Sequence, residues 1–223
     1  MTEAGAFPVP PLDRLPSGRH SLSREAVKQS QRGRLLYAIA HVVAERGYAA
    51  ATVADIVDRA SVSRSTFYEQ FPDKEACFIA AFDYAVEFVL REMERSWQEL
   101  DSHDWRAHVR SDLSTLLQVL AREPAFARAL HVEVLAAGSV ALEHRAQILS
   151  MFSERTYAVH VRARRHDPTL PELPRDAFEL HSGGVDELIR GRLLRDRHAD
   201  LVELIEPLVT ATLIMLGDGV SPG

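Results

Sequence analysis

The sequence is poor in cysteine and has no long apolar run. Its single cysteine, Cys77, excludes a disulfide within the chain. A membrane-spanning helix needs roughly 18 apolar residues in a row, and the longest apolar segment, residues 208–216, is interrupted by two threonines. The N-terminal residues also lack the basic-then-apolar order of a signal peptide. We therefore expect a soluble protein of the reducing cytoplasm that has no membrane partner.

Enzyme motifs are missing as well. The chain has no H-E-x-x-H, G-x-S-x-G, Walker or dinucleotide-binding motif. Residues 131–133, His-Val-Glu, match one fragment of the zinc deaminase signature, but the Pro-Cys-x-x-Cys that supplies the other ligands is absent. His103 and His108 are five residues apart and His160 and His166 are six apart, which suits shared ligation on one helix poorly. We expect no catalytic residue, no metal site and no cofactor.

Positive charge is also scarce, and the net charge is −6. Such a net charge argues against a nucleic-acid partner. The charge is unevenly distributed, however, because residues 14–34 hold six basic residues and one acidic residue. Such a stripe attracts phosphate, although a solvated basic tail has the same composition. Residues 1–20 contain four prolines and few large apolar groups, so residues 1–25 are expected to form a disordered basic arm. Its possible DNA contacts, together with those just beyond it, are Arg19, Arg24, Lys28 and Arg32.

Apolar residues recur at helical spacing from Ser30 onward, which predicts an all-α fold. The first helix is expected to end at Gly47. Thr52 is suited to cap a short second helix, residues 53–60, and Asp55 adds favourable charge at its start. Residues 167–176 contain three prolines and are expected to be a loop. Later helices are expected at residues 73–100, 105–122, 124–136, 140–165, 176–197 and 200–216.

A short polar helix is expected within the segment SVSRSTFYEQF, residues 61–71. Ser63 can cap a helix from Arg64 to about Gln70, and Pro72 cannot continue it. Phe67 and Phe71 are four residues apart and share one inner face. The polar side chains are left facing outward. Two short helices joined by a tight turn fit the helix-turn-helix that enters a major groove, although an ordinary three-helix turn has the same outline.

Residues 34–83, RLLYAIAHVVAERGYAAATVADIVDRASVSRSTFYEQFPDKEACFIAAFD, resemble the N-terminal DNA-binding domain of the TetR family of bacterial transcriptional regulators, of an actinobacterial type. One departure is Ser61, where the family usually has glycine, so slight strain is expected in that turn. The resemblance implies a three-helix helix-turn-helix domain at residues 26–75. A larger helical ligand-binding and dimerisation domain would follow at residues 76–223.

The resemblance also implies which residues meet double-stranded DNA. Arg64 is expected to read bases, because arginine offers paired donors to a guanine edge. Thr52, Tyr68 and Lys74 are expected to contact phosphates. The full set of expected DNA-binding residues is Thr52, Ser63, Arg64, Ser65, Thr66, Tyr68 and Lys74.

In the family the last two long helices of each chain pair with those of a second copy, which implies a homodimer. Gly183 and Gly184 would then allow close helix approach, and Pro207 would kink the final helix or mark its start. Ordinary core packing is the competing explanation for this apolar stripe. A homodimer also suits a palindromic DNA site, because a two-fold site needs a two-fold protein.

The larger domain is expected to hold an apolar pocket with few polar anchors, which fits a hydrophobic small-molecule effector. We expect a sequence-specific regulator, most simply a repressor released from a palindromic operator by that effector. The alternative is a regulator of the same fold that has no small-molecule effector and is controlled by a protein partner. The expected pocket residues, each of which ordinary packing also explains, are Phe82, Val86, Leu117, Phe126, Leu130, His131, Glu133, Phe152, Phe178 and His181.

Overall fold

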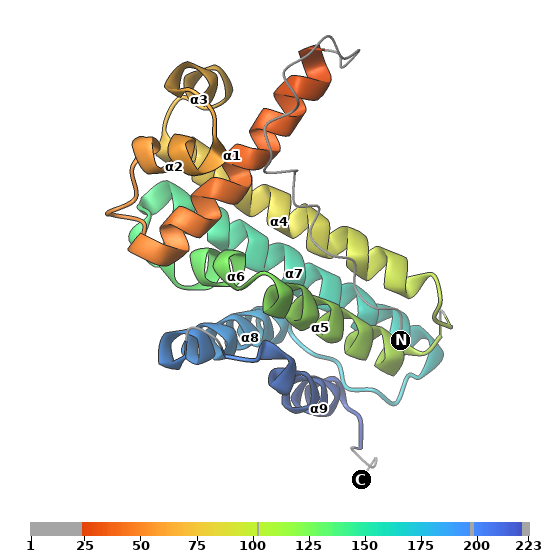
Figure 1. Ribbon diagram of the computed structural model, residues 1–223. Helices are drawn as coiled ribbons and strands as arrows, with labels where there is room; N and C mark the ends of the chain where they lie inside the picture. Colours follow the sequence, from red (N-terminus) through yellow and green to blue (C-terminus); the bar gives the residue numbers. More distant parts are fainter. Residues whose placement is uncertain (1–23, 102, 197–198, 220–223) are drawn as a thin grey trace.

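The computed structural model describes residues 24–101, 103–196 and 199–219. Within these residues every regular element is a helix, which confirms the all-α prediction (Figure 1). The α-helices and the short 3₁₀ helices η1 and η2 are α1 (Arg24–Arg46), α2 (Val53–Ala60), α3 (Arg64–Gln70), α4 (Lys74–Trp97), α5 (Trp105–Arg122), α6 (Pro124–His131), η1 (Glu133–Ala136), α7 (Ser139–His166), α8 (Arg175–Arg195), η2 (Leu201–Leu204) and α9 (Ile205–Leu216).

Three expected boundaries need correction. Helix α1 begins at Arg24 rather than Ser30, so residues 24 and 25, placed in the arm by the sequence, are helical. The remainder of the expected arm, including Arg19, lies outside the described residues. The helix expected at residues 124–136 divides into α6 and η1, and the one at 200–216 divides into η2 and α9. Pro207 lies in the first turn of α9, where its missing N–H costs no hydrogen bond.

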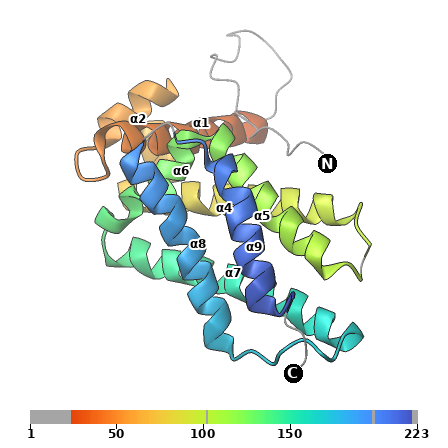
Figure 2. The same cartoon turned by 90° about the horizontal axis from the view of Figure 1, so that it is seen from below.

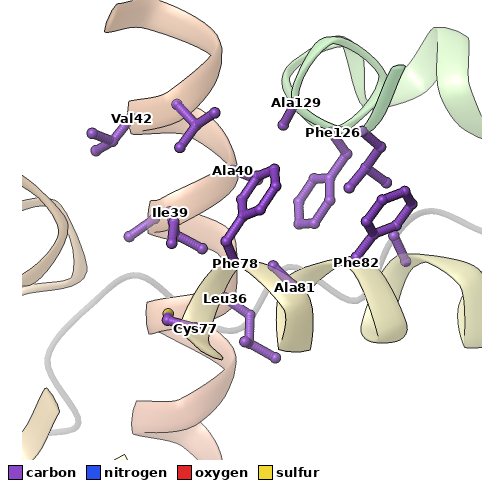
Figure 3. Packing of buried hydrophobic residues seen from close by; sticks show 14 of the residues in the cluster. Leu36, Ile39, Ala40, Val42, Cys77, Phe78, Ala81, Phe82, Phe126 and Ala129 are labelled. Atoms are coloured by element: carbon purple, nitrogen blue, oxygen red, sulfur yellow. The ribbon is translucent and has the colours of Figure 1, made fainter. Parts of the chain in front are cut away.

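The N-terminal part, α1 to α3, and the larger part, α4 to α9, share one apolar core. Leu36 and Ile39 of α1 pack in the same cluster as Phe78 of α4 and Phe126 of α6. Figure 3 shows the Phe126 ring from α6 reaching toward the α1 and α4 side chains. Helix α4 runs without a break from α3 into the larger part. Because α1 contacts both α4 and α6, a shift of either helix would displace α1.

The larger part is layered. Helix α5 packs against α4, α7 and α9, while α8 packs on α6 and α7. A second apolar cluster, which includes Leu117, Phe178 and Ile189, fills the space among these helices. Helices α8 and α9 form the face opposite α2 and α3 (Figures 1 and 2). The polar helix α3 and the α8–α9 face are therefore at opposite ends of the protein.

Candidate DNA-binding surface and ligand cavity

Local capping fixes the helix-turn-helix. The Thr52 hydroxyl accepts from the Asp55 amide at 3.2 Å, and the Asp55 carboxylate accepts from the Thr52 amide at 3.1 Å. The Ser63 hydroxyl accepts from the Thr66 amide at 3.0 Å and caps α3. Helix α3 has seven residues, too few to be stable alone. Phe67 is fully buried and holds α3 against the core. The caps predicted at Thr52 and Ser63 are both confirmed.

The outer face of α3 is polar and open. Ser63 lies 2.7 Å from Ser65 and 2.9 Å from Thr66, oxygen to oxygen, so three hydroxyl groups cluster at the start of the helix. Arg64 is exposed beside them. The Tyr68 side chain is 57% exposed, and its ring packs edge-on against Phe67. This face therefore offers a guanidinium, a phenol and small hydroxyls to solvent, and the DNA roles of these residues stay predictions.

The turn between α2 and α3 uses a left-handed residue. Ser61 has φ +51°, and it is the only described residue other than glycine with a positive φ. The buried guanidinium of Arg34 donates from Nη1 to the Ala60 carbonyl at 3.1 Å, which ties the turn to α1. The expected strain at Ser61 is thus present. Arg34, counted in the basic stripe, supports the turn and is not a free surface charge.

Lys74 ties the start of α4 to the turn before α2. Its Nζ donates to the carbonyl oxygens of Tyr48 at 2.7 Å and Ala51 at 2.9 Å. The ammonium also lies 4.2 Å from the centre of the Tyr48 ring, a cation–π contact. Burial lowers the pKa of the Lys74 amine. Two of its three N–H donors are therefore occupied, and one is left for the expected phosphate contact.

The first turns of α1 lie beside the end of α3. The Arg32 guanidinium sits 4.5 Å from the centre of the Phe71 ring. The Gln70 amide donates to the Lys28 carbonyl at 3.4 Å. The Lys28 side chain is exposed. These contacts keep Lys28 and Arg32 close to α3, and the contribution of either to DNA binding is a prediction.

The larger part encloses a cavity of about 120 Å³. An engineered cavity of roughly 150 Å³ holds a benzene molecule, so this space suits a small apolar group without rearrangement. Its wall is built from helices α4 to α9 and is mainly aliphatic and aromatic. The expected pocket residues that line it are Phe82, Val86, Phe126, Leu130, His131, Phe152 and His181.

Three expected pocket residues do not line the cavity. Leu117 is fully buried in the core among the later helices. Phe178 is also fully buried, with its ring 5.3 Å from that of Tyr157. Glu133 points instead to an ion pair with Arg128 at 3.1 Å. Helical spacing identifies inward-facing residues, but it does not tell which of them border a gap and which fill the core.

The sequence reasoning missed the charged groups of the cavity. The Asp186 carboxylate accepts from Nδ1 of His131 at 2.7 Å and pairs with the Arg145 guanidinium, which joins α6, α7 and α8. Burial opposes ionisation of Asp186, but the contacts with His131 and Arg145 outweigh it and hold the pKa of its carboxyl below the usual value. Asp186 falls in register with the buried Ser182 and Ile189, so a charged residue on the inward face of α8 is the sequence signal that could have identified it.

A second ion pair and a lone carboxyl complete the polar lining. Arg155 donates to Asp112 through Nε at 2.7 Å and Nη2 at 2.9 Å. The Arg155 guanidinium also stacks over the Trp97 ring, 4.0 Å from its centre. Glu123, at the junction of α5 and α6, lines the cavity too, and burial raises the pKa of its carboxyl. Each arginine in the lining is therefore paired with a carboxylate.

The cavity and the N-terminal part, α1 to α3, meet at Phe126. Phe126 lines the cavity and belongs to the same apolar cluster as α1. Its ring centre is 6.2 Å from that of Tyr37 in α1, and Tyr37 in turn lies 4.2 Å from the ring of His41. Phe82 of α4 likewise belongs to both the cavity wall and this core. A change in the cavity that displaces either phenylalanine would press directly on α1 or α4.

The described ranges hold no candidate metal site and no helix able to span a membrane. No group of three or more histidine, cysteine or acidic side chains there is arranged to hold a metal ion. In the same ranges, none of the helices has the length and apolar content that crossing a membrane requires. The helix-turn-helix and the cavity are thus the candidate functional sites within the described residues.

The sequence matches known regulators at its N-terminal end. The family model for bacterial regulatory proteins of the tetR family matches residues 35–81. The HTH-type transcriptional activator FasR of Mycolicibacterium smegmatis is 32% identical to this chain over 75 residues, which make up 34% of each protein. The chain thus spans about a third of the length of this curated relative.

Solved structures resemble nearly the whole chain. The fatty acid degradation regulator FadR from Bacillus halodurans is 20% identical and superposes with a TM-score of 0.75, covering 86% of this chain and 97% of its own. The transcriptional regulator FadR from Bacillus subtilis, solved in complex with stearoyl-CoA, is 21% identical with a TM-score of 0.71, covering 84% and 98%. At these identities the likeness concerns the fold.

Proposed function

We propose that this chain is a member of the TetR family of bacterial regulatory proteins, whose family model matches residues 35–81, and that it is a homodimeric repressor released from its operator by an apolar small-molecule effector. One observation carries the proposal. Phe126 borders the cavity on one side and packs in the core of α1 on the other, so one side chain joins a ligand site to a helix-turn-helix. The cavity favours an effector over the alternative of control by a protein partner alone.

The proposed DNA recognition rests on α3. Arg64 is exposed at the start of the helix and would read a base edge through its paired donors. Tyr68 and the third donor of Lys74 would contact phosphates on either side. Two such helices would enter successive major grooves roughly 34 Å apart on a palindromic site.

The proposed dimerisation rests on the outer face of α8. Leu180, Leu188 and Leu194 expose large apolar side chains on this face, Leu180 to 79%. An added Cβ at Gly183 or Gly184 would meet no atom within 4 Å, so these glycines do not serve close packing within the described chain. A second copy would cover the leucines and approach the glycines closely. Exposed apolar faces of this kind mark interaction sites.

The proposed effector binding rests on the cavity wall. Bacillus subtilis FadR was solved with stearoyl-CoA, and the aliphatic lining here suits an acyl chain or a similar apolar group. An occupant larger than the present cavity would press Phe82 and Phe126 outward. By linkage, release requires that the effector bind the DNA-free arrangement more tightly, and couplings of this kind are typically about 5- to 150-fold.

The proposal is tested by binding of the purified full-length protein to DNA from its own promoter. We expect sequence-specific, salt-sensitive binding by a dimer, and weaker binding when stearoyl-CoA is added. A promoter-reporter measurement with and without the protein gives the direction of regulation, and lower expression with the protein is expected. Binding that shows no preference for promoter sequence would contradict DNA recognition. Specific binding that no acyl-CoA alters would contradict an acyl effector.

A further inference from the structure

His181 has one ring nitrogen that nothing in the described part of the chain satisfies. This histidine belongs to α8 and lines the cavity. Its Nε2 lies 2.8 Å from Oγ1 of Thr212 in α9. Its Nδ1 is buried and has no hydrogen-bond partner among the described residues. Buried polar atoms in folded proteins nearly always have a partner, so this atom points to something that the chain itself does not supply.

Thr212 fixes which ring nitrogen carries the proton. The Thr212 hydroxyl donates its single hydrogen to the carbonyl oxygen of Leu208, at 2.7 Å. Toward His181 it can therefore only accept, so Nε2 of His181 is the nitrogen that bears hydrogen. Burial lowers the pKa of the His181 imidazole, which keeps the ring uncharged at neutral pH. The unsatisfied Nδ1 is then a bare acceptor and requires a donor.

The charged groups of the lining do not call for a charged occupant. Arg155 is held at both Nε and Nη2 by Asp112. Arg145 is paired with Asp186 through Nη2, and its buried Nε, which has no partner among the described residues, can be met by the oxygen of an uncharged hydroxyl or amide. Burial raises the pKa of the remaining carboxyl, Glu123, which favours its neutral form. A carboxylate placed here would lose its hydration without gaining an unpaired cation.

We propose that the part of the effector held inside the cavity is uncharged and largely apolar and carries a hydroxyl or amide N–H group, and that Nδ1 of His181 accepts the hydrogen bond from that group; any charged part of the effector would lie outside the cavity. The inference rests on the proposed effector function of the same cavity. Thr212 is a positioning residue in this scheme, because it holds the imidazole in the tautomer that accepts. An ether or hydrocarbon of equal size leaves Nδ1 unsatisfied.

The test compares two isomers that differ in a single donor, hexan-1-ol and 1-methoxypentane, chosen to match the size of the cavity. Isothermal titration calorimetry with the full-length protein gives their affinities, and hexanoate serves as the charged probe. We expect the alcohol to bind about ten-fold more tightly than the ether, the difference that one hydrogen bond to a buried acceptor makes. Hexanoate should bind more weakly than the alcohol.

Three variants separate recognition from structure. His181→Phe keeps a ring and removes the Nδ1 acceptor, so the preference for alcohol should disappear. Thr212→Val releases the tautomer and should reduce the same preference. His160→Phe is the matched control. His160 also bonds through Nε2, to the Pro171 carbonyl at 2.9 Å, and has a buried Nδ1 without a partner, but it lies outside the cavity lining. This variant should keep the wild-type preference.

The outcomes distinguish the inference from the function on which it rests. Equal binding of alcohol and ether by the wild-type protein would overturn the role of His181 and leave the cavity as an effector site. An alcohol preference that His181→Phe retains would overturn it as well. Failure of both isomers to bind would overturn the effector site and the inference together.

Discussion

The ammonium group of Lys74 donates to the carbonyl oxygens of Tyr48 and Ala51, so the first residue of α4 holds the turn that leads into α2. This pair of hydrogen bonds, called the latch below, joins α4, which borders the cavity, to the helix-turn-helix. We expect Lys74→Met to lower the free energy of unfolding by about 1–2 kcal/mol, because two carbonyls lose a charged donor. Urea denaturation measures this loss.

The same variant tests the phosphate contact separately. If the third donor of Lys74 reaches a phosphate, the slope of log affinity against log salt concentration should fall by about 1 in Lys74→Met. Lys28→Met, at an exposed position of α1, is the control for stability and should leave the unfolding free energy unchanged. An unchanged unfolding free energy in Lys74→Met would refute the latch, and an unchanged salt slope would refute the phosphate contact.

Arg64 and Tyr68 should have separable effects on DNA binding. Arg64→Ala is expected to weaken binding to the operator by about 1–3 kcal/mol and to relax the preference at one base pair. Tyr68→Phe removes only the exposed phenol oxygen and should weaken binding to all sequences alike. Competition binding with operators mutated one base pair at a time measures both effects. Equal losses of affinity and selectivity in the two variants would contradict these roles.

Ser61→Gly should stabilise the protein. Ser61 is left-handed, with φ +51°, and this conformation costs a residue other than glycine roughly 1–2 kcal/mol. Since glycine also gives the unfolded chain more freedom, the expected net gain is about 0.5–1 kcal/mol, measured by thermal or urea unfolding. Ser61→Ala keeps the strained Cβ and should bring no gain. A gain of equal size in both variants would exclude backbone strain as the cause.

Asp186 should contribute stability that depends on pH. The folded pKa of its carboxyl lies below the usual value, so its contribution is fully present above a pH of about 4 and is lost as pH falls through the folded pKa. Asp186→Asn should therefore cost about 3 kcal/mol at pH 7, and the gap to the wild type should narrow below about pH 4. Glu179→Gln, on the exposed side of α8, is the control. A gap that stays constant from pH 7 to pH 3 would contradict an ionised Asp186.

The α8 face should control association. Leu188 is half exposed on this face, and Leu188→Glu is expected to shift the dimer toward monomer, measured by sedimentation velocity over a range of concentrations. DNA affinity should fall together with the dimer. Leu142→Glu is the matched control, because Leu142 is exposed to a similar degree on α7. Dissociation by Leu142→Glu but not by Leu188→Glu would place the interface elsewhere.

The helices and caps of the N-terminal part were predictable because their causes are local. A hydroxyl accepts an amide only three residues ahead, so Thr52 and Ser63 predict helix starts directly from the sequence. The structure confirms both caps. Spacing of Phe67 and Phe71 likewise identified the inner face of α3. The start of α1 was missed because the polar residues ahead of Ser30 continue the helix without adding to its apolar stripe.

The sequence by itself determined the all-helical class, the helix-turn-helix and the polarity of its outer face, since each follows from interactions within a few residues. Tertiary structure alone decided that Lys74 reaches Tyr48, that Asp186 draws His131 and Arg145 together, and that Leu117 and Phe178 fill the core while Phe126 borders a cavity. Periodicity assigns a residue to the inside of a helix. Which neighbour it meets there, or whether it meets a gap, depends on how distant helices pack.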